Sequence, residues 1–150
     1  MSQARTTGDG YHFDRSGIAQ AGNDLLILNN AGNTRVLLKQ WEVSFFTGFA
    51  AGGYLFAIKY GVGGTPNLSG TPTAIDPASP AALSNVGSTW SVLPSPFNII
   101  IQAPYNPKKI LLWQAKKGKE SSLKSGDSFT LSCLTASLAQ QFTYAMEWEE

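Results

Sequence analysis

Apolar and polar residues alternate position by position in two stretches of the chain. Between Phe142 and Trp148, aromatic residues and a methionine occupy every second position, with Thr, Ala and Glu between them. The stretch from Tyr54 to Val62 repeats the pattern with Tyr, Phe, Ile and Val. Because successive side chains of a β-strand point to opposite faces, each stretch predicts a strand with one buried and one solvent-facing side.

Other short segments combine β-branched or aromatic residues with turn residues at their ends, which also favours strands. These segments are Asp24–Asn29, Thr34–Phe46, Trp90–Leu93, Asn98–Ala103, Lys109–Lys116 and Ser128–Thr135. Within the second of them the apolar positions change face between Leu38 and Trp41. This change predicts a β-bulge near Lys39–Gln40.

The predicted elements are all strands, since no window shows the apolar spacing of an amphipathic helix. Seven or eight short strands favour an all-β fold, a two-sheet antiparallel β-sandwich of jelly-roll type. A chain of 150 residues with 43% hydrophobic residues suits a single core. We therefore expect one domain over residues 17–150, preceded by an N-terminal segment, residues 1–16, that can extend as an arm.

A long segment between the predicted strands, residues 63–85, has a different composition. It holds four of the eight prolines and one charged residue, Asp76, which predicts an extended, irregular arm rather than a strand. It lacks the charge of a solvated linker, so we expect it to pack either on a partner or over an edge of its own sandwich. The interface candidates in this arm are Pro66, Leu68, Pro72, Ile75, Pro77, Pro80 and Leu83.

Charge is sparse and nearly balanced. Charged residues make up 14% of the chain, against about 25% in an average domain, and the formal net charge is +1. This balance gives no general attraction to nucleic acid or to anionic lipid. No apolar run is long enough to span a membrane, and residues 1–10 lack the features of a secretory signal, so we expect folding in a cytoplasm.

Lysines are concentrated between residues 108 and 124, which hold six of the eleven basic residues. If Lys109–Lys116 and Ser128–Thr135 form a hairpin, these lysines gather near its tip as a positive patch. Lys116, Lys117 and Lys119 are therefore interface candidates. Protection of a sheet edge by lysine is the simpler explanation of the same pattern.

Residues that could perform chemistry are few. One Cys and one His exclude a disulfide framework and an ordinary zinc site, and no metal or cofactor is expected. His12 has Asp14 and Ser16 near it in sequence, but such close neighbours in an extended segment do not converge on one substrate atom. Glu147 and Glu149 share a strand face and could form an acid/base pair or a calcium site, although a solvated strand end explains them more simply. We do not expect an enzyme; a glycosidase or lipase using His12 or Glu147 is the competing hypothesis.

The four tryptophans divide into two groups. Trp41, Trp113 and Trp148 lie inside apolar strand patterns and are predicted in a core or interface. Trp90 stands among Ser and Thr, which is typical of an exposed ring. Trp90 and Tyr105 are therefore the candidate glycan contacts, should the chain be a carbohydrate-binding module of a head or tail fibre.

Three motifs together resemble a known group of proteins. A strand runs into GVGGTPNL, then comes TPTAIDPASPAAL, and the chain closes on YAMEWEE. From Ile18 to Glu150 the chain resembles small β-rich proteins of tailed bacteriophages, which pair a GGTxT-like turn with a D-x-x-SPAA stretch. The resemblance implies a capsid cement or decoration protein that self-associates, as a trimer, and binds the major capsid protein on the outer head surface after assembly in the bacterial cytoplasm. It carries over no catalytic residue.

Overall fold

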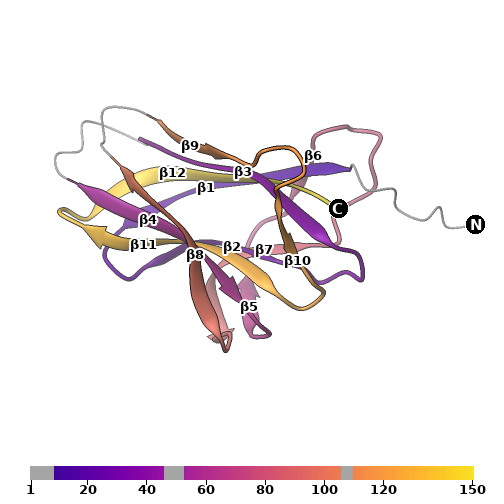
Figure 1. Cartoon of the computed structure of the whole chain (residues 1–150), viewed down its shortest axis with the longest axis horizontal. Coiled ribbons are helices and arrows are strands. Elements are labelled where there is room, and N and C mark those ends of the chain that lie inside the picture. Colours follow the sequence, from indigo (N-terminus) through magenta and orange to yellow (C-terminus); the bar gives the residue numbers. More distant parts are fainter. Residues whose placement is uncertain (1–8, 46–52, 106–109) are drawn as a thin grey trace, which may run out of the picture.

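The fold is a sandwich of two antiparallel sheets, seen in a computed structural model that describes residues 9–45, 53–105 and 110–150 (Figure 1). Sheet A has the order β10 (Ser121–Leu123), β3 (Val36–Phe45), β12 (Gln140–Glu149), β1 (Gly10–Ala19) and β6 (Thr73–Ala74), with β9 (Leu111–Gln114) also beside β3. Sheet B has the order β5 (Thr65–Leu68), β7 (Asn85–Val92), β2 (Asp24–Asn29), β11 (Ser128–Ala136), β4 (Tyr54–Gly61) and β8 (Phe97–Tyr105). Over these ranges, no helix has the length and apolarity needed to cross a membrane.

The strand order is that of a jelly roll. In sheet A, β12 lies between β1 and β3, and in sheet B, β11 lies between β2 and β4. Early strands therefore pair with the last two strands of the chain: β1 and β3 with β12, and β2 and β4 with β11. Strand β8 lies outside β4 in sheet B, and β9 and β10 lie outside β3 in sheet A. This nesting produces the two packed Greek keys of a jelly roll. The prediction of an all-β, two-sheet antiparallel sandwich is confirmed.

The core lies between the inner faces of the sheets. Strand β12 contributes Phe142, Tyr144, Met146 and Trp148, each at most 1% exposed. The Phe142 ring packs edge-on against Tyr54 of β4, with ring centroids 5.0 Å apart. Full burial of each such side chain contributes about 1.5–3 kcal/mol. The alternation that predicted the strand is therefore also what closes the core.

The predicted bulge in β3 is confirmed. Glu147 of β12 lies opposite Gln40, whereas the next residue, Trp148, lies opposite Leu38. Lys39 is the extra residue between them. The bulge lets both Leu38 and Trp41 face the core, where each is 0% exposed.

The N-terminal boundary at residue 16 is wrong. From Gly10 the chain is already strand β1, which pairs along its whole length with β12 inside sheet A. This strand was not predicted because two of its inward positions carry Arg15 and Gly17, which interrupt the alternation of apolar residues. Residues 1–8 lie outside the described part of the chain.

The arm over residues 63–85 is more regular than predicted. It contains β5, which pairs with β7, and the two-residue β6, which pairs with β1. Pro66 is tolerated in β5 because that strand lies at the edge of sheet B. The arm therefore lies along edges of its own sandwich, as the second alternative predicts, and its packing on a partner stays a prediction.

The predicted hairpin of Lys109–Lys116 with Ser128–Thr135 does not form. β9 pairs with β3 in sheet A, whereas β11 belongs to sheet B. The short strand β10 intervenes and also pairs with β3. Lys116, Lys117 and Lys119 lie in the turn between β9 and β10. Residues 106–109, which include two further lysines, are not among the described residues.

Sheet B curls strongly at one end. Strands β4 and β5 are separated by three other strands, about 19 Å in a flat sheet, yet Val62–Gly64 can bridge only about 14 Å. The sheet must therefore bend until the β4–β5 and β7–β8 connections meet. The Val62 amide donates to the Pro96 carbonyl and the Ser95 amide donates to the Val62 carbonyl, each at 3.0 Å. We call this curled end, residues 61–65 and 92–97, the tip; it projects away from sheet A in Figure 1.

The end of the arm is held by a buried carboxylate. Glu150 is 2% exposed, and its Oε1 accepts the Leu83 amide at 2.8 Å. Its Oε2 accepts the Ser84 amide at 3.2 Å and the Trp148 indole N–H at 3.0 Å. Burial alone would raise the pKa of Glu150, but these hydrogen bonds outweigh it and lower the pKa below its usual value.

We predict that Glu150→Gln destabilises the fold by about 2–3 kcal/mol at pH 7, because the charged acceptor of several buried donors is lost. Since the folded-state pKa is lowered, this contribution is complete above the unfolded pKa, about 4.3, and fades as the pH falls through the folded value. Urea unfolding at pH 7, 5 and 3 should therefore show the two proteins converging in acid. The exposed control Asp14→Asn should change stability by less than about 0.5 kcal/mol at pH 7. A Glu150→Gln deficit that is the same at all three pH values would contradict the role of the charge.

Candidate functional site

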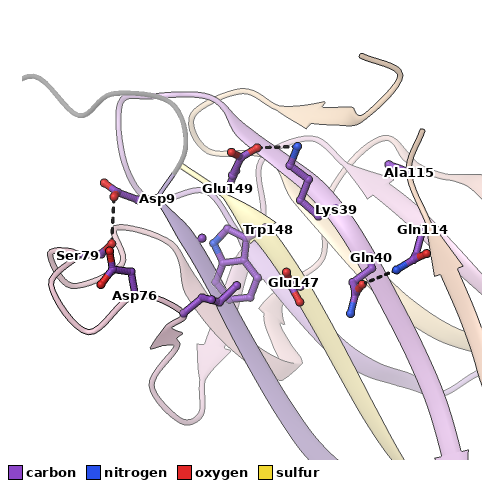
Figure 2. Close-up of a pocket in the computed structure, with 12 residues that line it drawn as sticks. Asp9, Lys39, Gln40, Asp76, Ser79, Gln114, Ala115, Glu147, Trp148 and Glu149 are labelled. Atoms are coloured by element: carbon purple, nitrogen blue, oxygen red, sulfur yellow. Dashed lines mark hydrogen bonds and ion pairs between the residues drawn. The ribbon is translucent and has the colours of Figure 1, made fainter. Parts of the chain in front are cut away.

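The outer face of sheet A is hollowed into a groove. Two adjoining depressions, of about 560 and 250 Å³, share Gln40 and Glu147 in their lining, and Figure 2 shows the larger of them. Six of the ten carboxylate side chains of the chain line these depressions. They are Asp9, Asp14, Glu42, Asp76, Glu147 and Glu149. We call this feature the acidic groove.

The floor of the groove follows from strand alternation. Since Met146 and Trp148 of β12 face the core, Glu147 faces outward. Its partners across the sheet are His12 of β1 and Gln40 of β3. The Gln114 amide of β9 donates to the Gln40 side-chain oxygen at 3.1 Å. Four strands thus place one row of polar side chains across the groove.

The single lysine of the groove is already neutralised. Lys39 Nζ lies 2.6 Å from a Glu149 oxygen and 2.9 Å from a Glu120 oxygen. Hydrogen bonds to Glu149, and then to Glu120, raise the pKa of Lys39, and Lys39 in turn lowers the pKa of Glu120. Because Lys39 is shared by two acids, the other carboxylates keep a negative potential over the groove.

The two rims of the groove differ in charge. One rim is formed by the arm and the start of β1, where the Ser79 hydroxyl donates to Asp9 at 3.0 Å and the Ala78 amide donates to Asp76 at 2.9 Å. The other rim is Gln114 and Ala115, after which the chain enters the lysine-bearing β9–β10 turn. Figure 2 shows the two rims on either side of Trp148 and Glu147. The lining of this second rim is uncharged; together with the exposed lysine turn that follows it in the chain, we call it the basic rim.

Two residues that the sequence offered separately as catalytic candidates come together here. His12 is directly opposite Glu147, and both line the smaller depression. Ser16 lies further along β1, opposite Thr143. Across the described ranges, no three or more His, Cys, Asp or Glu side chains are grouped closely enough to hold a metal ion. The arrangement suits attraction of cationic groups to the sheet surface.

A second surface of interest is the tip, which is apolar. Val62, Val92 and Leu93 are 41%, 58% and 65% exposed, and Ile99 and Ile100 of the adjoining β8 are each 44% exposed. The tip contains no charged residue, and neither do the strands that continue from it, β5 as far as Leu68 and β8 as far as Tyr105. Several exposed aliphatic side chains on neighbouring segments mark an interaction site more often than a single exposed aliphatic residue does.

The tip is also closely packed. Gly64 has φ +82°, a conformation that favours glycine, and a Cβ there would lie 2.8 Å from the Pro94 backbone nitrogen. A Cβ at Gly61 would lie 2.7 Å from the Pro94 ring. The connection between β4 and β5 is therefore a close-packed turn.

The interface candidates of the arm do not share one surface. Pro66 and Leu68 lie in β5 of sheet B, whereas the later members run along the edge of sheet A. Exposed among the candidates are Leu68, Ile75, Pro77, Pro80, Leu83, Lys116, Lys117 and Lys119, and half-buried are Pro66 and Pro72. Ile75 also lines the acidic groove.

The glycan-contact candidates are placed unfavourably. Trp90 is half-buried, packs edge-on against Phe97 with centroids 5.7 Å apart, and donates its indole N–H to Asp24 at 3.1 Å. Tyr105 is 4% exposed and packs against Phe142 in the core. Neither ring is a free stacking platform, so this expectation is corrected.

The acceptor of Trp90 is the centre of a polar cluster that the sequence did not reveal. Asp24 of β2 also accepts the Ser132 hydroxyl at 2.6 Å and pairs with Lys59 at 3.4 Å. The Lys59 ammonium lies 4.8 Å from the centre of the Phe97 ring. These side chains tie together strands β7, β2, β11, β4 and β8 on the outer side of sheet B and so hold the curl that forms the tip.

We predict that Asp24→Ala destabilises the fold by about 2–4 kcal/mol, because it leaves the mostly buried Lys59 charge and the Trp90 N–H without an acceptor. Urea unfolding followed by tryptophan fluorescence measures this change. The exposed Asp14→Ala variant is the control and should change stability by less than about 0.5 kcal/mol. Equal, small effects of both substitutions would show that the cluster does not hold the curl.

Comparisons with known proteins could single out one of these surfaces as the functional one. The chain matches no protein-family model, no curated protein and no solved structure.

Proposed function

We propose that this chain is a structural virion protein that self-associates and binds the outer surface of a phage head through its tip, as a cement or decoration protein does. The observation that carries the proposal is the uncharged, exposed aliphatic surface of the tip, built on two hydrogen-bonded connections. The resemblance of the sequence to small phage proteins supplies the setting. The jelly roll is compatible with it but does not carry it, since this fold serves capsid and lectin domains alike.

The apolar character of the tip suits a permanent protein contact. Its aliphatic side chains are 41–65% exposed, so completing their burial is worth about 1 kcal/mol each. Charged groups are costly at the centre of an interface, and the tip has none. Because the tip is fixed before it binds, little conformational entropy is lost on docking.

Self-association would strengthen such a contact. A few aliphatic side chains from one copy offset only part of the association cost of about 4–15 kcal/mol. Linked copies bind a repeating shell through several tips at once, and each later contact forms at high effective concentration. Self-association and shell binding are therefore two parts of one function.

The proposal predicts that Leu93→Asp weakens binding to phage heads at least about tenfold, because it places a charge in the apolar contact. The assay is co-sedimentation of the purified chain with heads of the encoding phage that were produced without it, together with the temperature at which those heads release DNA. Wild-type chain should bind and raise that temperature.

Leu138→Asp is the matched control. Leu138 is 57% exposed, and its carbonyl accepts the Tyr54 hydroxyl at the start of β4, whereas the tip adjoins the last residue of the same strand. This variant should bind like wild type. Equal binding by both variants would remove the tip from the proposal, and failure of the wild-type chain to bind heads would overturn the proposed function.

A further inference from the structure

The turn between β9 and β10 presents unpaired lysines. Lys116, Lys117 and Lys119 are all exposed. The turn is closed by the Lys119 amide, which donates to the Lys116 carbonyl at 2.8 Å, and by Gly118 at φ +79°. None of the three lysines forms an ion pair with an acid in the described part of the chain. The turn therefore holds three positive charges beside the acidic groove.

Most carboxylates of the acidic groove likewise form no ion pair with a lysine or arginine among the described residues. Glu149 is paired with Lys39, but Asp9, Asp76 and Glu147 have no cationic partner among the described residues. The lysine turn begins immediately after Ala115, which lines the groove, yet its ammonium groups do not reach the acids of their own chain. The acids of one rim and the lysine turn that follows the other rim thus do not neutralise each other within one chain.

A two-fold axis would bring these charges together. If two copies face each other across the groove, a rotation of 180° about an axis along it carries the basic rim of one copy over the acidic rim of the other. The same operation places the second basic rim over the first acidic rim, so one surface satisfies itself twice.

We infer that two copies of this chain join face to face across the acidic groove, with the lysine turn of each copy against Asp9 and Asp76 of the other. The inference rests on the proposed function, of which self-association is one part, and it specifies the surface. The contact leaves both tips free for a shell. It gives a dimer where the family resemblance implies a trimer, so the stoichiometry itself discriminates between them.

The first test is sedimentation velocity of the purified chain at several salt concentrations. Charge pairing between exposed groups is screened within about 30 Å at 0.01 M salt and about 3 Å at 1 M. The dimer dissociation constant should therefore rise at least about tenfold over that range. A chain that is monomeric at every salt concentration, or a dimer or trimer indifferent to salt, would overturn the inference.

The second test is charge reversal with cross-rescue. One variant carries Lys116→Glu, Lys117→Glu and Lys119→Glu, and the other carries Asp9→Lys and Asp76→Lys. Each alone places like charges on facing rims and should be monomeric at low salt. Mixed together, the two variants should form a heterodimer, because both rim contacts then join opposite charges. Failure of the mixture to dimerise, with both variants folded by urea unfolding, would overturn the inference.

Two further variants guard against indirect effects. Asp9→Asn with Asp76→Asn keeps side-chain hydrogen-bonding groups on the acidic rim while removing its charge, and should weaken the dimer. Mixed with the lysine-to-glutamate variant, it should restore only one of the two rim contacts and so dimerise more weakly than the Asp9→Lys, Asp76→Lys variant does. Lys124→Glu changes the net charge as much as Lys117→Glu does, but lies in the β10–β11 turn away from the groove lining, and should leave the dimer unchanged. Equal weakening by Lys124→Glu and Lys117→Glu would assign the salt effect to net charge and overturn the inference.

Failure of this inference and failure of the proposed function are distinguishable. Co-sedimentation with heads tests the tip, whereas sedimentation velocity of the free chain tests the acidic groove. A salt-indifferent oligomer that still binds heads would remove only the face-to-face contact. A salt-sensitive dimer that ignores heads would remove only the proposed function.

Discussion

The alternation of side chains along β12 links the interior of this protein to its outer surface. One face of the strand contributes Phe142, Tyr144, Met146 and Trp148 to the core, and the other contributes Glu147 and Glu149 to the acidic groove. Because β12 is paired on both sides, by β1 and β3, its register is fixed by the buried residues. A slip by one residue would expose the aromatic side chains and bury the acids. The groove is therefore as firmly specified as the core.

The arm and the short connections of sheet B fix the positions of the outer parts of the molecule relative to the core. The three-residue link between β4 and β5 forces the curl, and the Asp24 cluster holds the curled strands together. The arm then crosses to sheet A and is anchored by Glu150, at the end of β12. The tip, the arm and the groove are consequently parts of one framework, which suits a protein whose function is to hold other molecules in fixed positions.

The sequence allowed the sheets to be predicted where the pattern is strong and local. Strands β4 and β12 follow from the alternation of apolar and polar residues, and the bulge at Lys39 follows from its change of face. Strand β2 follows from its apolar composition and the turn residues that bound it. Strand β1 was missed because Arg15 and Gly17 occupy inward positions, and β5, β6 and β10 were missed because strands of two to four residues show no period. The arm of Pro-rich sequence was recognised as unusual, yet only strand pairing reveals which edges it covers.

The candidate surfaces were less accessible to prediction. That Glu147 and Glu149 share a face followed from their spacing, but His12, Gln40 and Gln114 join them only through the order of four strands. Trp90 seemed exposed among Ser and Thr because its acceptor, Asp24, lies 66 positions away in sequence. Long-range pairings of this kind leave no local signal in one sequence.

The central claim is that this chain works by docking its tip on a larger shell. A cryo-electron microscopy reconstruction of phage heads that carry the chain tests it most directly. The account predicts density for the jelly roll on the outer head surface, with Val62, Val92 and Leu93 buried against the capsid and the groove faces turned toward a neighbouring copy. Density in which the tip points into solvent, or heads with no density for the chain, would contradict it.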